Sequence, residues 1–187
     1  GNVLTLTGAN RVVSNTSGST LTFGSGLTVD LTGTEKEWYA DATSPIVVNG
    51  IITGSVGSYV TGTVTGGLIK SGDGVLELRG ANTYSGTTTV SLGTLELKNS
   101  GAIDDAAAGV VVEAGGRLKV TNAEAVRKIE GAGALTVDAT LTTGDATDTA
   151  FSGAIDGTAG LTKAGTGTLE LSGVAANTYA GATAVNA

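Results

Sequence analysis

The sequence predicts an all-β solenoid, in which short strands stack coil upon coil along one axis. Three observations lead to this fold class. The chain of 187 residues has 31 glycines, one proline and only 4% aromatic residues, so small and β-branched side chains must fill its core. Threonine and valine recur in short runs between glycine, asparagine, aspartate and serine, which is typical of many short strands joined by tight turns. The third observation is an internal repeat.

The repeat is a glycine-bounded segment that occurs twice. Residues 67–80 read GLIKSGDGVLELRG, and residues 160–173 read GLTKAGTGTLELSG, 93 residues further along the chain. After a two-residue insertion the match resumes, with NTYSG at 82–86 answered by NTYAG at 177–181. Residues 1–10 contain a partial third copy, VLTLTGAN. Repetition of this kind indicates stacked, similar units instead of one irregular core.

The centre of each copy is Leu-x-Leu, which predicts a half-buried strand. The period of two places Leu76 and Leu78 on one face and Glu77 on the other. Strands this short are marginal unless further strands pair with them, so we expect roughly eight or nine coils of about 20 to 25 residues. We expect these leucines to be buried in rows: Leu4, Leu6, Leu76, Leu78, Leu95, Leu97, Leu118, Leu135, Leu161, Leu169 and Leu171. Glu77, Glu96 and Glu170 should face solvent.

The segment that follows Leu-x-Leu is expected to form a corner of the coil. Gly80 and Gly86 can take a positive φ, and Asn82 can tolerate the left-handed region and bond its own backbone. Tyr84 is expected to lay its ring over this corner with its hydroxyl in water.

Two regions depart from the repeating pattern. Residues 33–45 (GTEKEWYADATSP) are polar and charged and hold the only Trp and Pro of the chain, so they are expected to project as a loop. Residues 123–129 follow Asn122 and precede Gly131, a pattern that favours a single helical turn.

The repeat followed by Asn-Thr-Tyr-x-Gly-x-Thr-x-Val resembles the passenger-associated transport repeat of autotransporters, also called the autotransporter-associated β-strand repeat. The resemblance covers residues 67–97 and 160–187, and FSGAI at 151–155 is similar to the family's usual lead-in. It implies a right-handed parallel β-helix, a single solenoid over residues 1–187. It also implies export through the periplasm and outer membrane to the bacterial surface, and a role in adhesion, aggregation or passenger secretion. The resemblance brings no catalytic residues with it.

Composition excludes several classes of site. The chain has no cysteine, histidine or methionine, so no disulfide, thiol nucleophile, imidazole base or zinc site of the usual type can form. A net charge of −7 argues against nucleic-acid binding, which needs clustered Lys and Arg. No stretch approaches the roughly 18 apolar residues that span a bilayer, so we expect no membrane insertion by this segment. No cofactor is implied.

Acidic residues are the remaining candidates for chemistry. Asp104 and Asp105 share one predicted loop, while Asp145, Asp148 and Asp156 surround another. Either group could hold calcium or supply paired carboxylates. Carboxylates also favour turns for local hydrogen bonding, and no histidine supports them, so we interpret them as solvated turn residues. The GDG sequence at 72–74 lacks the tandem repetition of calcium-binding β-rolls.

Trp38 and Tyr39 are the candidate partner-binding residues. Adjacent aromatic rings in a projecting loop could stack on a sugar ring or anchor a protein. The competing interpretation is that one ring packs back against the side of the solenoid.

Three functions remain open on the sequence. The first is a structural, non-catalytic module of an autotransporter-like adhesin, which acts as a rigid spacer and assembly unit. Its partners would be adjoining coils of the same or an identical chain, since residues 183–187 stop within the motif that residues 1–6 would complete, and a head-to-tail contact of this type builds a filament. The second is a glycan- or host-protein-binding module. The third is a polysaccharide-degrading enzyme, which lacks a plausible general base.

Overall fold

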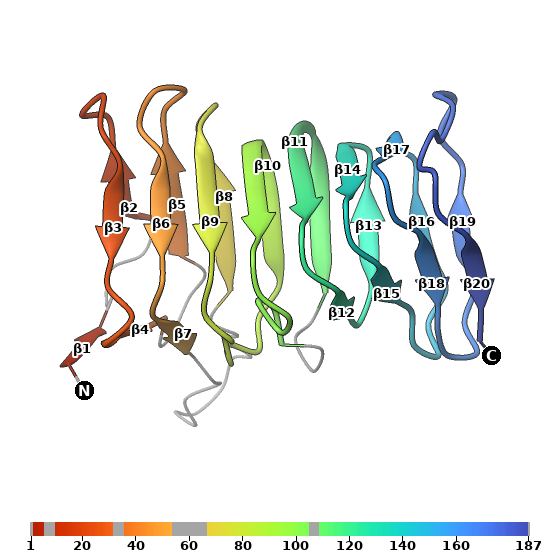
Figure 1. Cartoon of the computed structure of the whole chain (residues 1–187), viewed down its shortest axis with the longest axis horizontal. Coiled ribbons are helices and arrows are strands. Elements are labelled where there is room, and N and C mark those ends of the chain that lie inside the picture. The colour runs from red at the N-terminus through yellow and green to blue at the C-terminus, as the bar shows by residue number, and fades with distance from the viewer. Residues whose placement is uncertain (1, 6–9, 32–35, 54–66, 105–108, 187) are drawn as a thin grey trace.

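The computed structural model describes residues 2–5, 10–31, 36–53, 67–104 and 109–186. Within these ranges every regular element is a β-strand. The strands stack side by side along one axis, which makes the molecule a β-solenoid of about 7 turns (Figure 1). None of the described residues belongs to a helix that could cross a membrane.

Each coil has three faces, and strands on the same face pair in parallel with those of the neighbouring coils. The pairing order on face 1 is β2 (Asn10–Asn15), β5 (Lys36–Ala40), β8 (Leu68–Ser71), the first part of β10 (Thr88–Leu97), the first part of β11 (Val110–Val120), β13 (Ile129–Gly131), β16 (Thr149–Phe151) and β19 (Leu169–Leu171). On face 2 it is β3 (Leu21–Phe23), β6 (Ile46–Val48), β9 (Val75–Leu78), the later parts of β10 and β11, β14 (Ala134–Val137) and β17 (Ile155–Asp156).

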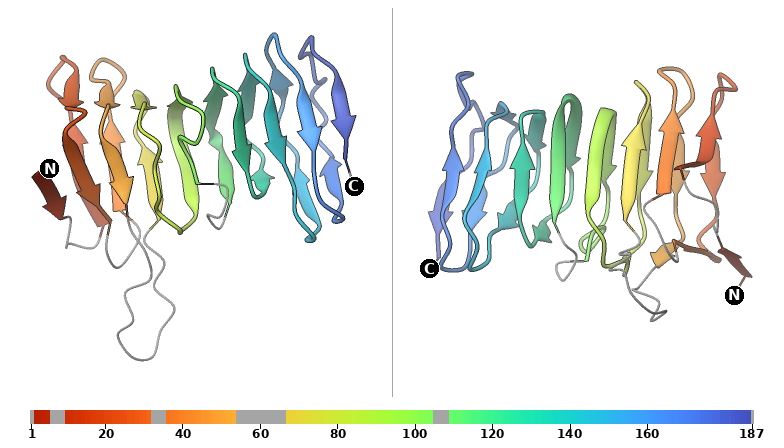
Figure 2. Two further views of the ribbon diagram at one scale, coloured as in Figure 1. Left: turned by 60° about the horizontal axis from the view of Figure 1, so that its bottom comes forward. Right: turned by 180° about the vertical axis from the view of Figure 1, so that it is seen from behind.

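Face 3 is divided into two separate sheets. The first sheet contains β1 (Asn2–Thr5), β4 (Leu27–Asp30) and β7 (Ile51–Thr53). The second contains β12 (Glu124–Val126), β15 (Leu141–Thr143), β18 (Leu161–Lys163) and β20 (Thr183–Val185). Figure 2 shows the two sheets along one side of the solenoid. The segments between β7 and β12 on this face, residues 80–87 and 98–104, contain no strand, so their backbone groups need other partners.

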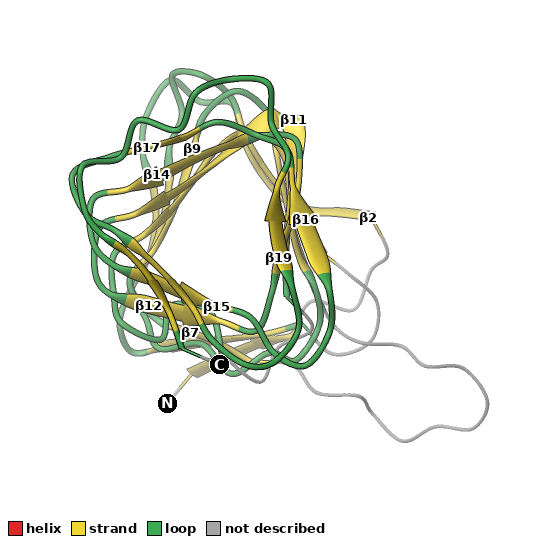
Figure 3. Ribbon diagram, turned by 90° about the vertical axis from the view of Figure 1, so that its right-hand side faces the viewer, coloured by secondary structure: helices red, strands yellow, loops and turns green. Residues whose placement is uncertain are grey.

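The solenoid is right-handed, as the resemblance implied. In Figure 3 the C-terminal end faces the viewer, and the chain runs counter-clockwise from β14 through β15 to β16 as it approaches. Most turns are short: Leu68 pairs with Thr88 after 20 residues, and Thr88 pairs with Val110 after 22. The turn from Lys36 to Leu68 takes 32 residues, which is one reason why the chain forms fewer than the eight or nine coils expected.

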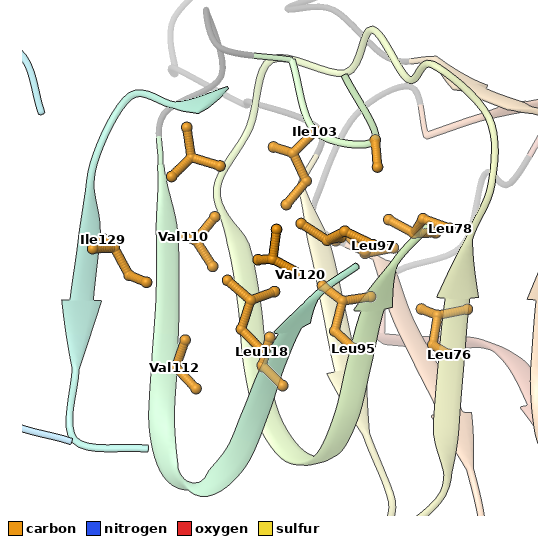
Figure 4. Close-up of a cluster of buried hydrophobic side chains, with 14 of the residues drawn as sticks. Leu76, Leu78, Leu95, Leu97, Ile103, Val110, Val112, Leu118, Val120 and Ile129 are labelled. Carbon is orange, nitrogen blue, oxygen red and sulfur yellow. The ribbon is translucent and has the colours of Figure 1, made fainter. Parts of the chain in front are cut away.

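The core is a column of inward-facing side chains from all three faces. In most strands alternation buries every second residue, as in β9, where Leu76 and Leu78 are 0% exposed. Leu76 pairs with Leu95, which pairs with Leu118, so leucines do form a row along face 2 (Figure 4). The prediction of burial is confirmed for these leucines: Leu76, Leu78, Leu95, Leu97, Leu118, Leu135 and Leu161.

The predicted row is wrong at the two ends of the stack. Leu169 and Leu171 in the last face 1 strand are only half-buried, and Leu4 in β1 is 38% exposed. Each of these strands has a described partner on one side only, so no second coil covers its side chains. Leu6 lies outside the described residues.

Glycines with a left-handed backbone turn the chain between faces. Gly93 has φ 69°, and a Cβ on it would lie 2.3 Å from the carbonyl oxygen of Gly72 in the preceding coil. Only glycine permits this combination of positive φ and close approach. The helical turn expected at residues 123–129 is wrong, because β12 and β13 occupy this range. Glu124 and Val126 point inward there, so period-two burial decides the local structure.

Candidate functional site

Trp38 lies in the core of the solenoid and not in a projecting loop. It is an inward residue of β5 with 0% exposure, and its ring lies 5.4 Å from that of Phe23, centroid to centroid. The interpretation that one ring packs back against the solenoid therefore describes Trp38, whose ring has no free face for a sugar. Tyr39 points the other way and is half-buried. Its proposed contact with a partner stays a prediction.

The projecting loop expected at residues 33–45 is wrong for residues 36–40, whereas residues 41–45 contain no strand. Lys36 to Ala40 form β5, and Lys36 itself is 1% exposed. The polar composition misled the prediction because this charged residue, like Trp38, faces the interior. Residues 33–35 lie outside the described part of the chain.

The acidic residues singled out from the sequence are held by local partners and do not converge. Asp145 accepts hydrogen bonds from the hydroxyl of Thr147, from Arg127 and from the backbone N–H of Thr147, and these contacts lower its pKa. Asp148 accepts a bond from the N–H of Thr168 in the next coil, which lowers its pKa in the same way. No three acidic residues lie together among the described residues. Asp105 lies outside the described residues.

Asp104 and Asp156 complete the candidate acids. Asp156 lies on the outside of face 2, where Arg117 donates to it at 3.2 Å. A hydrogen bond with Thr136, more than the arginine, lowers the pKa of Asp156. Asp104 borders a groove on face 3.

An asparagine in each repeat forms hydrogen bonds with the preceding coil, a contact that we call a clasp. Asn82 Oδ1 accepts the N–H of Ile52 at 2.7 Å, and the next residue, Thr83, donates its N–H to the carbonyl of Ile52 at 2.9 Å. Asn177 and Thr178 make the same two contacts to Ile155, at 3.0 and 2.8 Å. The side chain thus replaces one of the backbone acceptors that a strand would supply. We expected the Asn82 side chain to bond its own backbone, but its main role is the contact with Ile52 in the preceding coil.

In the first repeat the asparagine also reaches the following coil. Asn82 Nδ2 donates to the carbonyl of Ala102 at 2.5 Å, and the Asn82 N–H donates to the carbonyl of Gly101 at 3.1 Å. Asn82 is 3% exposed. One buried amide therefore links three successive coils in the part of face 3 where no strand is present.

A tyrosine and a threonine close the corner of each repeat. The Tyr84 hydroxyl bonds the hydroxyl of Thr88 at 2.6 Å, and Tyr179 bonds Thr183 at 2.5 Å. Tyr84 is 0% exposed, so the expectation of a hydroxyl in water is wrong. Burial raises the pKa of Tyr84 far above its usual value, although the bond to Thr88 opposes the shift. The Tyr84 ring faces inward because Thr88, the partner of its hydroxyl, is itself buried.

A lysine in each repeat is buried and holds the glycine turn. Lys70 Nζ donates to the carbonyl oxygens of Ser71 and Gly72, both at 2.7 Å, and to that of Leu92 in the next coil at 3.0 Å. Lys163 makes the first two bonds, to Ala164 and Gly165. Burial lowers the pKa of Lys70 to about 8, and Asp73 partly opposes this shift. The recurrence of Lys in both copies was the sequence signal for this role.

The two repeats lie on different faces of the solenoid. Four turns from Leu68 lead to Thr149 on face 1, and Leu161 then follows on face 3, in β18. The Leu-x-Leu of the first repeat is therefore on face 2 and that of the second on face 1. Because both copies make the same clasps, the contacts depend on the repeat and not on the face that it occupies.

Glu124 is a buried carboxylate that sequence reasoning missed. It is 3% exposed, and its two oxygens accept the N–H groups of Gly101, Ala102 and Ile103 at 2.9 to 3.2 Å. It lies at the floor of a groove of about 590 Å³ on face 3. Hydroxyl and carboxylate groups line part of this groove: Thr83, Ser100, Asp104, Thr140 and Thr142.

Charged side chains connect the coils along the outside of face 2. Glu96 lies between Lys98 and Lys119, at 3.4 and 3.3 Å, and Lys98 also lies 3.9 Å from Glu77. Glu170 is exposed as expected, but Glu96 is only 8% exposed. The prediction is wrong for Glu96 because the two lysine side chains cover it.

Comparison with known proteins points to one family. The profile of the passenger-associated-transport-repeat matches residues 68–97 and 161–187. The adhesin BmaC autotransporter of Brucella suis biovar 1 (strain 1330) is 32% identical over 177 residues, which cover 90% of this chain and 5% of the adhesin. No solved structure gives a significant match. The two matched repeats, the parallel β-solenoid and the similarity to the adhesin together support an autotransporter passenger domain that carries the passenger-associated transport repeat.

Proposed function

We propose that this chain is a rigid, non-catalytic spacer in the passenger of an autotransporter adhesin. The observation that carries the proposal is the unbroken pairing of face 1, where parallel strands follow one another from β2 to β19. Where face 3 lacks strands, Asn82 and Glu124 supply the missing acceptors. A ladder that continues through irregular segments resists bending at them, which suits a module that separates other parts of a long protein.

The cell surface or the surrounding medium is the location that the similarity to an autotransporter adhesin suggests. Export through the periplasm and outer membrane is part of the proposal. The absence of cysteine is compatible with this route, because an unfolded chain without thiols cannot form stray disulfides in an oxidising compartment.

A non-catalytic role is supported by the state of the candidate carboxylates. Asp145 is held by Thr147 and Arg127, and Asp156 by Thr136 and Arg117. A general acid needs a pKa raised toward neutrality, whereas these contacts lower the pKa of both groups. The relative that covers most of the chain is named an adhesin.

A binding module is the second candidate, favoured by the groove beside Glu124. Its volume of about 590 Å³ is within the range of small-molecule sites, and the hydroxyls of Thr140 and Thr142 are groups that can bond a glycan. Tyr39 on the outside of β5 is the second place where a glycan or host protein could bind.

Small-angle X-ray scattering and a glycan array together test the spacer. A spacer gives the scattering of a stiff rod as long as the strand stack, and no saturable binding to glycans or host cells. Saturable binding that is lost in Thr142→Ala or Tyr39→Ala, but kept in the control Ser25→Ala in an exposed turn, would assign the chain to the binding class instead. Depolymerisation of an acidic polysaccharide would contradict both readings.

A further inference from the structure

Three backbone N–H groups of one turn converge on a single carboxylate. The turn covers residues 99–103, in the part of face 3 that contains no strand. The N–H groups of Gly101 and Ala102 donate to Glu124 Oε2 at 2.9 and 3.2 Å, and that of Ile103 donates to Oε1 at 2.9 Å. Successive N–H groups of a turn that point to one place form a nest, which is an anion-binding arrangement.

The nest is held in shape by contacts of its own backbone and of the preceding coil. The Ala102 N–H also lies 3.2 Å from the carbonyl oxygen of Asn99, which closes the turn. Gly101 has φ 75°, in the left-handed region that favours glycine. Asn82 donates its N–H to the carbonyl of Gly101 and its Nδ2 to that of Ala102. Because Glu124 makes none of these contacts, they remain when its carboxylate is removed.

The carboxylate reaches the nest from the next coil, where its own strand holds it. Glu124 is 21 to 23 residues away from its three donors. Its N–H donates to the carbonyl of Thr140 at 3.0 Å, and it pairs with Leu141 in β15. Its side chain points inward from β12, and the residue is 3% exposed. Glu124 therefore occupies the nest as a bound ligand would, without a covalent link to the turn.

A groove of about 590 Å³ adjoins the nest and connects it to solvent. Gly101, Ile103 and Glu124 all belong to its lining. Ile103 is 1% exposed, and Figure 4 shows it among the buried side chains of the core. Gly101 is exposed, and a Cβ built on it would have nothing within 4 Å. A small molecule thus has access to the nest from the Gly101 side, without any opening of the core.

We propose that this turn is a carboxylate-binding site, which the chain fills with Glu124 and which takes a small carboxylate from solution when the Glu124 side chain is shortened. The inference goes beyond the spacer function, because it assigns a ligand chemistry to the nest and its groove. Bonds from N–H groups to a charged carboxylate are stronger than bonds between neutral groups. Glu124→Ala removes one methylene carbon and the carboxylate, and acetate supplies the same four non-hydrogen atoms.

Amide hydrogen exchange of the full 187-residue chain tests the proposal. In Glu124→Ala, exchange at the N–H groups of Gly101 and Ile103 should accelerate at least about tenfold, because each loses the acceptor that protects it. Sodium acetate should slow this exchange again, by about tenfold at ten times its dissociation constant. Sodium chloride and the neutral analogue acetamide, at the same concentration and pH, should not. Acetate should have no effect on the unmodified chain, whose nest is filled, or on the control Glu113→Ala, which loses an exposed carboxylate.

Three results would overturn the proposal: no difference between acetate and chloride in Glu124→Ala, an equal effect of acetamide, or an equal effect of acetate on Glu113→Ala. If Glu124→Ala does not fold in chloride, its circular dichroism spectrum should recover in acetate but not in acetamide, and lack of recovery contradicts the site.

Glu124→Gln provides a second variant, in which a neutral side chain of the same size still fills the nest. Exchange at Gly101 and Ile103 should accelerate in this variant too, because an amide nitrogen replaces one of the accepting oxygens, and acetate should not reverse the change. A response to acetate equal to that of Glu124→Ala would mean that acetate binds elsewhere. The spacer function is measured by scattering of the unmodified chain, so failure of the carboxylate site is distinguishable from failure of the spacer.

Discussion

Replacement of Asn82 by alanine should destabilise the solenoid much more than the same change at Asn177. The two residues hold corresponding places in the repeats and clasp the preceding coil in the same way. Asn82 is buried and has a second partner in the following coil, the carbonyl of Ala102. Asn177 is exposed. The pair is therefore a matched test of the coil-to-coil bridge.

The size of the loss in stability follows from the polar groups that each substitution leaves without partners. Asn82→Ala leaves the Ile52 N–H and one bond of the Ala102 carbonyl unmade, and both residues are 0% exposed. At about 1 to 3 kcal/mol for each unsatisfied buried group, we expect the free energy of unfolding to fall by about 2 to 4 kcal/mol, since some water can enter. Asn177→Ala removes one bond, that to the Ile155 N–H. Because the Asn177 side chain itself is exposed, a water molecule can take the place of its oxygen, so the cost should be about 1 kcal/mol or less.

Urea unfolding followed by circular dichroism measures the difference, and amide hydrogen exchange locates it. Exchange at the Ile52 N–H should accelerate in Asn82→Ala, with little change at the N–H of Leu76 on face 2. Equal loss of stability in both alanine variants, or unchanged protection of Ile52, would refute the argument that the side chain bridges the coils. Asn82→Asp separates the two contacts, because it keeps an acceptor for Ile52 but removes the donor to Ala102.

Three further changes test other parts of the structure. Leu78→Asp should lower the free energy of unfolding by about 4 kcal/mol or more, because a buried apolar contact is replaced by an unpaired charge; an unchanged thermal melt would contradict the buried row. Glu96→Gln should cost about 0.5 to 1 kcal/mol in low salt and less at 1 M NaCl, whereas Glu170→Gln should have no measurable effect in the same melts. Lys70 has a lowered pKa of about 8 in the folded chain, so the unfolded chain binds its proton more tightly and stability should rise by about 1 to 2 kcal/mol between pH 7.5 and 9.5. This rise should be absent in Lys70→Met and present in the control Asn122→Ala, as measured by urea unfolding at both pH values.

The fold class was predictable because its signal is repeated many times. Leu-x-Leu between glycines specifies a short strand with one buried face, and each further copy adds the same information. The internal leucines, such as Leu76 and Leu95, were placed correctly for this reason. The ends were not, because burial there depends on a neighbouring coil and not on the residue's own pattern.

Trp38 shows where composition fails as a guide. Its segment has charged residues on both sides of the ring, and polarity alone predicted a loop. In the structure Lys36 and Trp38 alternate inward while Glu37 and Tyr39 are partly exposed. A long lysine stem can line an apolar interior if its ammonium group finds acceptors, and the sequence does not show whether such acceptors exist.

The clasps were also beyond sequence reasoning, although the residues that form them were recognised as a motif. Asparagine and tyrosine between glycines are typical of a turn, and turn chemistry explains them without any contact to another coil. What distinguishes a clasp is its partner in a preceding coil, Ile52 for Asn82. The repetition of Asn-Thr-Tyr in both copies was the one sign that the segment did more than turn the chain.

Side-chain clasps also account for how the repeat tolerates irregular spacing. A backbone ladder requires that like strands fall on the same face. Four full turns after Leu68 the chain reaches Thr149 on face 1, but the second repeat begins only at Leu161, which is two faces further along. The contacts of Asn177, Tyr179 and Lys163 survive this displacement, because they are made within the repeat or to whichever strand lies directly beneath it. Coils of unequal length, such as the turns of 20 and 22 residues that follow Leu68 and Thr88, can then separate repeats without a loss of stacking. A passenger segment built in this way can vary its intervening coils while each repeat still fastens the coil before it.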